Sequence, residues 1–346
     1  MTLIDPRSFS PKDFLSKVTR FGIKEQNGAR LLGAVLGKGH LDPQKWLDVG
    51  IINAQLANTL DILPELKLEK LVTSSVDGFQ KILFKTEDNL NIETVIIPLQ
   101  KENNVTVCLS SQVGCVMGCT FCATAKMSKR RNLKAWEIID QFRQARAIAE
   151  GSGGRVTGAV FMGMGEPFLN YKNVMQAAES FCYPVFNAIS AKAITISTVG
   201  ILDKINRFTE EKRPFRLSIS LGAATDAKRQ KFVPIAAKTP IKSIIAAARR
   251  HSLFTKERIM LSYVCIGNEN IFPEDAEALA ELVGDTQIRL DLIEVTDPTN
   301  LHRRPTEEEM SLFRDALNTY LKQPVVRRYS GGADISAACG TLAGKG

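Results

Sequence analysis

The sequence predicts an α/β fold: a partial barrel of six strand–helix units, preceded by a small helical N-terminal domain and a linking β-hairpin. Three observations support this prediction. The first 70 residues carry apolar side chains at helical spacing, two segments between residues 79 and 98 have the composition of strands, and β-rich and helical segments alternate from Val105 onward. Such alternation is typical of a parallel sheet with right-handed crossovers.

The N-terminal domain, assigned to residues 1–70, is expected to consist of short helices. Glycine and proline interrupt its apolar pattern and mark the ends of the helical segments. The expected helices span residues 11–21, 28–36, 43–49 and 54–60.

The linking β-hairpin is assigned to residues 71–100. Its two strands are expected at residues 79–85 and 90–98, and apolar side chains alternate in the second of them. The intervening residues 86–89, Thr-Glu-Asp-Asn, favour a turn. We expect this hairpin to connect the helical domain to the barrel.

The barrel is assigned to residues 101–346, where six strands alternate with six helices. The strands are expected at residues 105–109, 156–162, 193–197, 215–221, 258–265 and 288–295. The helices are expected at residues 135–150, 171–181, 201–208, 241–251, 273–283 and 307–321. A final strand, at residues 324–328, leads into a glycine-rich tail. In parallel barrels the functional residues lie in the loops that follow the strands, so we expect the site there.

Composition limits the class of protein. With 346 residues, 44% of them hydrophobic, the chain can bury a full core. The N-terminus has no basic segment followed by an apolar run, and no segment approaches the length of a membrane span, so a cytoplasmic protein without membrane contact is expected. Lysine and arginine exceed aspartate and glutamate by 45 to 37, which modestly favours a polyanionic partner such as nucleic acid.

Three of the seven cysteines, Cys115, Cys119 and Cys122, follow the first barrel strand in the spacing C-x3-C-x2-C. In a reducing compartment, clustered thiols indicate metal binding or catalysis rather than disulfides. A structural zinc site normally has four protein ligands, whereas three thiols without a nearby fourth can hold three irons of a [4Fe–4S] cluster and leave one iron open. The alternative is three ordinary buried cysteines.

Polar residues at the ends of the next strands are candidates for binding a cofactor. Residues 163–167, Gly-Met-Gly-Glu-Pro, follow the second strand; their glycines allow close backbone approach, and the Glu166 carboxylate can accept hydrogen bonds from an ammonium group. Ser197 and Ser220 end the third and fourth strands. A plain strand–helix turn, and serines that satisfy loop backbone groups, remain the alternatives.

Two further cysteines are candidates for catalysis. Cys339 lies among small residues in the tail, Gly331 to Gly340, and Cys108 precedes the cluster motif by a few residues. Two thiols near one site can form and break a transient disulfide. On the residues alone, either could also be a core cysteine.

Together, residues 107–115, 163–167 and 334–340 closely resemble the RlmN/Cfr family of radical S-adenosylmethionine (SAM) RNA methyltransferases. The similarity extends from about Glu93 to the C-terminus and, more faintly, through the helical N-terminal domain. It implies a radical SAM barrel in which Cys115, Cys119 and Cys122 hold a [4Fe–4S] cluster and SAM binds the open iron. It also implies that the N-terminal domain is of an RNA-binding type.

The resemblance further implies the chemistry. Family members methylate an amidine carbon of adenosine, C2 or C8, in 23S ribosomal RNA and, for some, in transfer RNA. Two SAM molecules are implied per turnover: one methylates Cys339, and the other yields a radical that takes hydrogen from this S-methyl group. The resulting carbon radical adds to the base, and Cys108 then attacks the Cys339 sulfur, which releases the product as a disulfide forms. Glu93 is implied as the proton acceptor, although on the residues alone it is a polar side chain on a strand.

The resemblance also places residues at SAM-contact positions and shows departures from the family pattern. The implied SAM contacts are Gly165, Glu166, Ser197, Ser220, Leu221, Gly222 and Asp297. Gly222 stands where the family has histidine, and Asp297 where it has asparagine. A carboxylate beside SAM would change its affinity or the pH dependence of binding. The N-terminal family signature Lys-Pro-Phe-Arg is absent from residues 24–30.

We therefore expect a methyl synthase that acts on adenosine in 23S ribosomal RNA and possibly transfer RNA. C2 is favoured over C8, because residues 163–171 are nearer to the C2 branch, although the end at Gly346 is nearer to the C8 branch. A low-potential electron donor such as flavodoxin and a monomeric state are also expected. Two alternatives stay open: a diverged member that methylates a non-RNA substrate, and a non-catalytic iron–sulfur protein that binds RNA.

Overall fold

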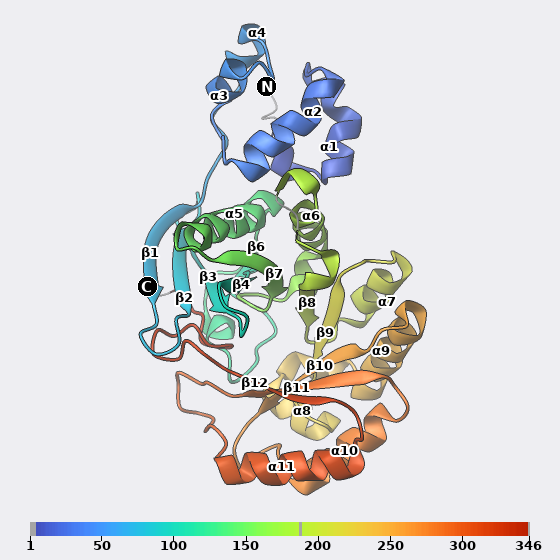
Figure 1. Cartoon of the computed structure of the whole chain (residues 1–346). Helices are drawn as coiled ribbons and strands as arrows, with labels where there is room; N and C mark the ends of the chain where they lie inside the picture. Colours follow the sequence, from blue (N-terminus) through green and yellow to red (C-terminus); the bar gives the residue numbers. More distant parts are fainter. Residues whose placement is uncertain (1–4, 187–188, 345–346) are drawn as a thin grey trace.

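The computed structural model describes residues 5–186 and 189–344, so the outermost residues of the predicted first and last domains lie outside the described residues. Its main feature is a ten-stranded sheet with the order β1-β2-β3-β4-β7-β8-β9-β10-β11-β12 (Figure 1). Within this sheet, β1 to β4 pair antiparallel, and each neighbouring pair after β4 in this order, from β4–β7 to β11–β12, is parallel. Because β1 and β12 are opposite edges of this order, the sheet is open, and the predicted partial barrel is confirmed.

The parallel strands are close to their predicted positions. They are β4 (Asn104–Cys108), β7 (Arg155–Phe161), β8 (Ile194–Thr198), β9 (Arg216–Ser220), β10 (Ile259–Cys265), β11 (Ile288–Glu294) and β12 (Val325–Arg328). The helices of the six units are α5 (Ala135–Gly151), α6 (Tyr171–Phe181), α7 (Leu202–Glu210), α9 (Ile241–Thr255), α10 (Pro273–Val283) and α11 (Glu307–Tyr320). Figure 1 shows these helices around the outside of the sheet.

Several elements were not predicted, among them a small antiparallel sheet of β5 (Gln112–Val113) and β6 (Arg131–Asn132). Two others extend the expected architecture. One is a short helix, α8 (Asp226–Phe232), whose first turn is capped by the Thr225 hydroxyl. The other is β1 (Lys67–Thr73), which pairs with β2 (Gln80–Lys85) and extends the predicted hairpin of β2 and β3 (Asn91–Pro98) to three strands. Because β1 is exposed along nearly its whole length, its sequence lacks the apolar alternation by which a half-buried strand is recognised.

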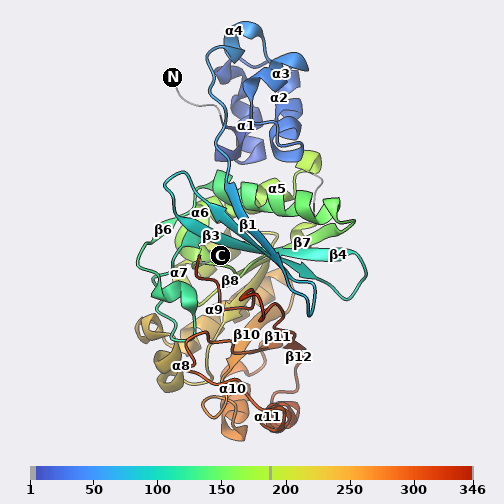
Figure 2. The ribbon, with the colours of Figure 1, turned by 90° about the vertical axis from the view of Figure 1, so that its left-hand side faces the viewer.

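The N-terminal helices are α1 (Pro11–Lys17), α2 (Glu25–Leu32), α3 (Pro43–Asp48) and α4 (Ala54–Ala57), and they form one end of the molecule (Figures 1 and 2). The buried Arg7 joins this end to the barrel. Its Nη1 lies 3.8 Å from the carboxylate of Asp140 on α5, and its carbonyl accepts a hydrogen bond of 2.8 Å from Gln176 on α6. The helical end is therefore tied to α5 and α6.

The C-terminal tail returns across the sheet to the antiparallel strands. Figures 1 and 2 both show the last described part of the tail, up to Gly344, beside the antiparallel strands. The Asn91 side chain, at the start of β3, donates a hydrogen bond of 2.9 Å to the Gly344 carbonyl. The tail thus connects the far edge of the parallel sheet to the predicted linking strands. In the described part of the chain, no helix is both long enough and apolar enough to span a membrane.

Candidate active site

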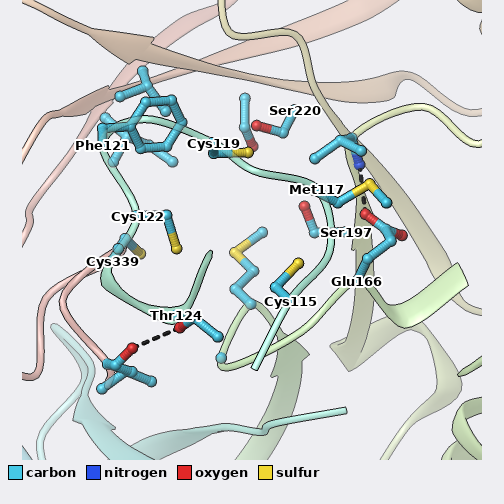
Figure 3. A pocket seen from close by; sticks show the side chains of 18 of the residues that line it. Cys115, Met117, Cys119, Phe121, Cys122, Thr124, Glu166, Ser197, Ser220 and Cys339 are labelled. Carbon is cyan, nitrogen blue, oxygen red and sulfur yellow. Dashed lines mark hydrogen bonds between the residues drawn. The ribbon is translucent and has the colours of Figure 1, made fainter. Parts of the chain in front are cut away.

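A cavity of about 160 Å³ lies where the parallel strands end, at the position that the fold predicts (Figure 3). Loop residues after β4 form one side, and the ends of β7 to β11 form the other. The lining brings together most of the residues predicted from the sequence. These are Cys115, Cys119, Cys122, Gly165, Glu166, Ser197, Ser220 and Cys339.

The loop that carries the three clustered cysteines is fixed to its surroundings by backbone hydrogen bonds. The Thr120 N–H donates to the Phe232 carbonyl at 3.0 Å, and the Ala123 N–H donates to the Gly340 carbonyl at 2.8 Å. Gly114 opens the loop with a φ of +63°, and a Cβ there would lie 2.4 Å from the Lys129 carbonyl oxygen. The loop is therefore held by α8 on one side and by the C-terminal tail on the other.

The three thiols face a common space (Figure 3) and suit a multi-iron cluster better than a single ion. Among the described residues, no three His, Cys, Asp or Glu side chains are close enough together to hold one metal ion. A [4Fe–4S] cluster requires no such closeness, because each thiolate binds a different iron. Burial raises the pKa of Cys115 to about 11 and that of Cys119 further still, so a bound cation would be needed to keep these thiols ionised at neutral pH.

Glu166 places a buried carboxylate at the wall of this cavity. Its two oxygens accept hydrogen bonds of 2.9 Å from the backbone N–H groups of Phe168 and Val199. Burial nevertheless raises its pKa to about 7, while these hydrogen bonds act in the opposite direction. A ligand ammonium group at this position would offset the cost of burying the charge.

This raised pKa predicts that Glu166 lowers the stability of the cluster-free protein at high pH. Below pH 4.5 the group is protonated in both states; as pH rises toward 7 the unfolded chain loses this proton first, so folding becomes less favourable. The loss is about 3 kcal/mol by pH 8. Unfolding by urea at pH 5 and pH 8 should show most of this loss in the wild type and none of it in Glu166→Gln, because a small part of the loss already occurs below pH 5. Glu281→Gln, an exposed control, should follow the wild type; equal pH dependence in all three proteins would contradict the prediction.

Gly165 lets the chain pass close to the loop of the clustered cysteines. Its φ is +101°, and a Cβ there would lie 2.5 Å from Cβ of Gln112. Gln112 in turn accepts a hydrogen bond of 2.8 Å from the Glu166 N–H. An added side chain would therefore move the residue that positions Glu166.

We expect Gly165→Ala to lower the free energy of unfolding by about 1–3 kcal/mol and to weaken SAM binding, because it combines strained backbone with this close contact. Thermal denaturation and equilibrium dialysis with SAM measure the two effects. Gly151→Ala is the matched control, because nothing lies within 4 Å of a Cβ at that position. Wild-type affinity for SAM in Gly165→Ala would contradict this role of Gly165.

Three residues expected at SAM-contact positions do not line the cavity. Leu221 is fully buried, and the Gly222 carbonyl accepts a hydrogen bond from Asn270 at 2.9 Å. The Asp297 carboxylate closes its own loop, accepting hydrogen bonds from the Thr299 N–H at 2.8 Å and the His302 N–H at 3.1 Å. The two departures from the family pattern, Gly222 and Asp297, therefore lie outside the cavity lining.

A second cavity adjoins the first and brings together the two outlying thiols. Cys108 and Cys339 both line it, and Cys339, Met162 and Leu342 also line the first cavity. Both cysteines are free thiols. Burial raises the pKa of Cys108 to about 12, the nearby Cys339 adds to this rise, and the cation Arg328 opposes it. Cys339 thus lies between the clustered cysteines and Cys108.

Arg328 was not predicted from the sequence to be functional, although its position at the end of a parallel strand could have indicated it. It ends β12, the last parallel strand, where a functional side chain is expected in such a sheet. It lines the second cavity, and its guanidinium donates to the Met162 sulfur at 3.4 Å.

Glu93 lies outside the lining of both cavities, under the C-terminal tail. Its Oε2 accepts hydrogen bonds from the backbone N–H groups of Ala343 at 2.7 Å and Gly344 at 3.0 Å. Its Oε1 lies 3.1 Å from the ammonium nitrogen of Lys81. The tail that carries Cys339 therefore also covers this carboxylate.

Comparison with known proteins gives a consistent result. Residues 109–283 match the radical SAM superfamily. The chain is 48% identical over 267 residues to a probable RNA methyltransferase of Myxococcus xanthus, covering 77% of this chain and 73% of the relative. It is 37% identical over 287 residues to a probable dual-specificity RNA methyltransferase RlmN of Leptospira biflexa, covering 82% and 80%. A crystal structure of a radical SAM methyltransferase from Sphaerobacter thermophilus superposes over 100% of both chains with a TM-score of 0.89 and 31% identity.

Proposed function

Because the chain belongs to the radical SAM superfamily, and within it to the RNA methyltransferases of RlmN type, we propose that it methylates C2 of an adenosine in 23S ribosomal RNA, with transfer RNA as a second substrate. The observation that carries this proposal is the position of Cys339 in the lining of both cavities. One side chain can then receive a carbon in the first cavity and give it up beside Cys108 in the second.

The residues of the first cavity would hold the cofactors. Cys115, Cys119 and Cys122 would bind a [4Fe–4S] cluster, and Glu166 would accept a hydrogen bond from the amino group of SAM. When bound, the cluster and SAM supply radical chemistry at the first cavity, with electrons from a low-potential donor such as flavodoxin. The hydroxyls of Ser197 and Ser220 face the same space and would bind other polar groups of SAM.

Cys339 and Cys108 would carry the carbon and release it. The Cys339 sulfur would take a methyl group from one SAM. After a hydrogen atom has been removed from that group, its carbon would bond to the adenine, which then gives up one proton and returns one electron to the donor system that started the radical chemistry. Cys108 then attacks the Cys339 sulfur: an S–S bond forms, the carbon–sulfur bond to the product breaks, and its electron pair remains on the product until a proton replaces it. The two thiols line one cavity, so the attack of one sulfur on the other needs no large movement of the chain.

Glu93 would accept the proton lost from the adenine carbon. Ala343 and Gly344 cover its Oε2, so the tail has to move from this carboxylate when RNA enters. Lys81 is placed to hold the other oxygen as the tail leaves.

The test is mass spectrometry of nucleosides from 23S ribosomal RNA and transfer RNA. The reconstituted protein is incubated without oxygen with a reductant and SAM that carries a labelled methyl group. Labelled 2-methyladenosine supports the proposal, whereas labelled 8-methyladenosine would replace C2 with C8. Label that stays on Cys339 would favour a non-RNA substrate, and a protein that cleaves no SAM would favour a non-catalytic RNA-binding role.

A further inference from the structure

Tyr329 is an exposed aromatic residue at the second cavity. It follows β12 directly and lines the same cavity as Cys108, Cys339 and Arg328. Its exposed fraction is 70%, compared with 46% for Tyr320 on α11. A single exposed aromatic residue is ordinary on a protein surface, so its meaning depends on how the ring is held.

Two contacts fix the Tyr329 ring. Its hydroxyl donates a hydrogen bond of 3.0 Å to the Asp77 carboxylate, and its ring meets the Phe79 ring edge-on, with the centroids 6.3 Å apart. Since most of the side chain is still accessible, these contacts hold the ring without covering it.

The backbone after Tyr329 is fixed in the same way. The Gly332 N–H donates to the same Asp77 oxygen at 2.8 Å. Gly331 packs directly against Phe79, where a Cβ would lie 2.3 Å from the ring. The segment that carries Tyr329 is therefore packed onto the residues that precede β2. Because the ring is already held in place, a ligand that binds to it would cost little conformational entropy.

We propose that Tyr329 is the platform on which the target base of the RNA stacks as it approaches Cys339, an inference that rests on the proposed function. A base in a folded RNA has to be extruded before its ring carbon can be reached, and proteins hold extruded bases on aromatic side chains. Arg328 lines the same cavity; its guanidinium lies 3.8 Å from the Asp291 carboxylate, and the remaining part of its fork could contact the sugar–phosphate backbone. Tyr329 would be a binding residue and would take no part in the chemistry at the two thiols.

Substitution separates the stacking role from a structural one. Tyr329→Ala is expected to raise KM for RNA about 10- to 100-fold, which is the usual loss when one stacked base loses its aromatic partner. Tyr329→Phe and Tyr329→Trp keep a ring and should retain near wild-type KM. Methylation of Cys339 by SAM, measured by mass spectrometry of the protein, should be unchanged in all three. Tyr320→Ala on α11 is the matched control and should behave as wild type.

A fluorescence measurement tests stacking directly. The two native tryptophans, Trp46 and Trp136, are buried, so a tryptophan at position 329 would report separately. We expect substrate RNA to quench the emission of Tyr329→Trp but not that of Tyr320→Trp. An RNA with an abasic nucleotide at the mapped target position should quench much less.

Three outcomes would overturn the inference. Tyr329→Phe could be as impaired as Tyr329→Ala, which would assign Tyr329 to the hydrogen bond with Asp77; Tyr329→Ala could have wild-type KM; or Tyr329→Trp could show no quenching. Failure of the proposed function looks different, because the wild type would then methylate no RNA. In that case quenching of Tyr329→Trp by unmodified 23S ribosomal RNA, which needs no mapped target position, still reports whether RNA bases stack on residue 329.

Discussion

Replacing Cys339 with alanine is expected to abolish methylation of RNA while SAM is still cleaved. The variant lacks the sulfur that we propose receives the methyl group, whereas Cys115, Cys119, Cys122 and Glu166, which also line the first cavity, are unchanged. The rate of RNA methylation should fall by more than about 10³-fold, because the electron-poor carbon of the base cannot attack the methyl group of SAM directly. Labelled nucleosides and 5′-deoxyadenosine, both measured by mass spectrometry, report the two activities.

The control for this experiment is Cys182→Ala, which removes a half-buried thiol that lines neither cavity. It should retain both activities. Any labelled methyladenosine formed by the Cys339→Ala protein would contradict the role of Cys339 as the carbon carrier. Loss of SAM cleavage in that variant would instead show that Cys339 also supports cofactor binding. Cys339 could do so because it lines the first cavity.

Replacing Cys108 with alanine is expected to trap the protein on its RNA. Without the second thiol of the shared cavity, nothing attacks the Cys339 sulfur, so the carbon–sulfur bond to the base persists. Most of the protein should then run as a covalent complex with RNA on a denaturing gel. Digestion with nuclease should leave a nucleotide on the peptide that contains Cys339.

Cys265→Ala is the control here, because Cys265 is a buried thiol in β10 and lines neither cavity. It should form no complex. Free methylated RNA released by Cys108→Ala at the wild-type rate would exclude Cys108 as the resolving thiol. A variant that neither methylates nor crosslinks would place Cys108 earlier in the reaction.

The sequence predicted the parallel sheet well, because buried strands and amphipathic helices leave a periodic pattern. It did not predict β1, whose exposed residues carry no such pattern, or α8, a helix of seven residues. The cysteine spacing identified the loop that lines the first cavity, since these ligands lie close together in the chain.

Contacts between distant segments were harder to predict. The hydrogen bonds from Ala343 and Gly344 to Glu93 join residues about 250 positions apart, and no local pattern records them. Leu221, Gly222 and Asp297 were placed by resemblance alone, and they do not line the first cavity; their contact with SAM stays a prediction. Arg328 shows the reverse case. It lies at the end of a parallel strand, where functional residues are expected, but two consecutive arginines are common on protein surfaces and gave no reason to predict a functional role.

Cys108 and Cys339 share one cavity, which has a consequence for the supply of electrons under the proposed reaction. If the product leaves as these thiols join, every chain ends its cycle oxidised by two electrons and can accept no further carbon until a dithiol reduces it. With only a one-electron donor for the cluster, the reaction stops after a burst of one methyl group per chain. The thiol redox state of the cell would then limit how much RNA is modified, independently of how much enzyme or SAM is present.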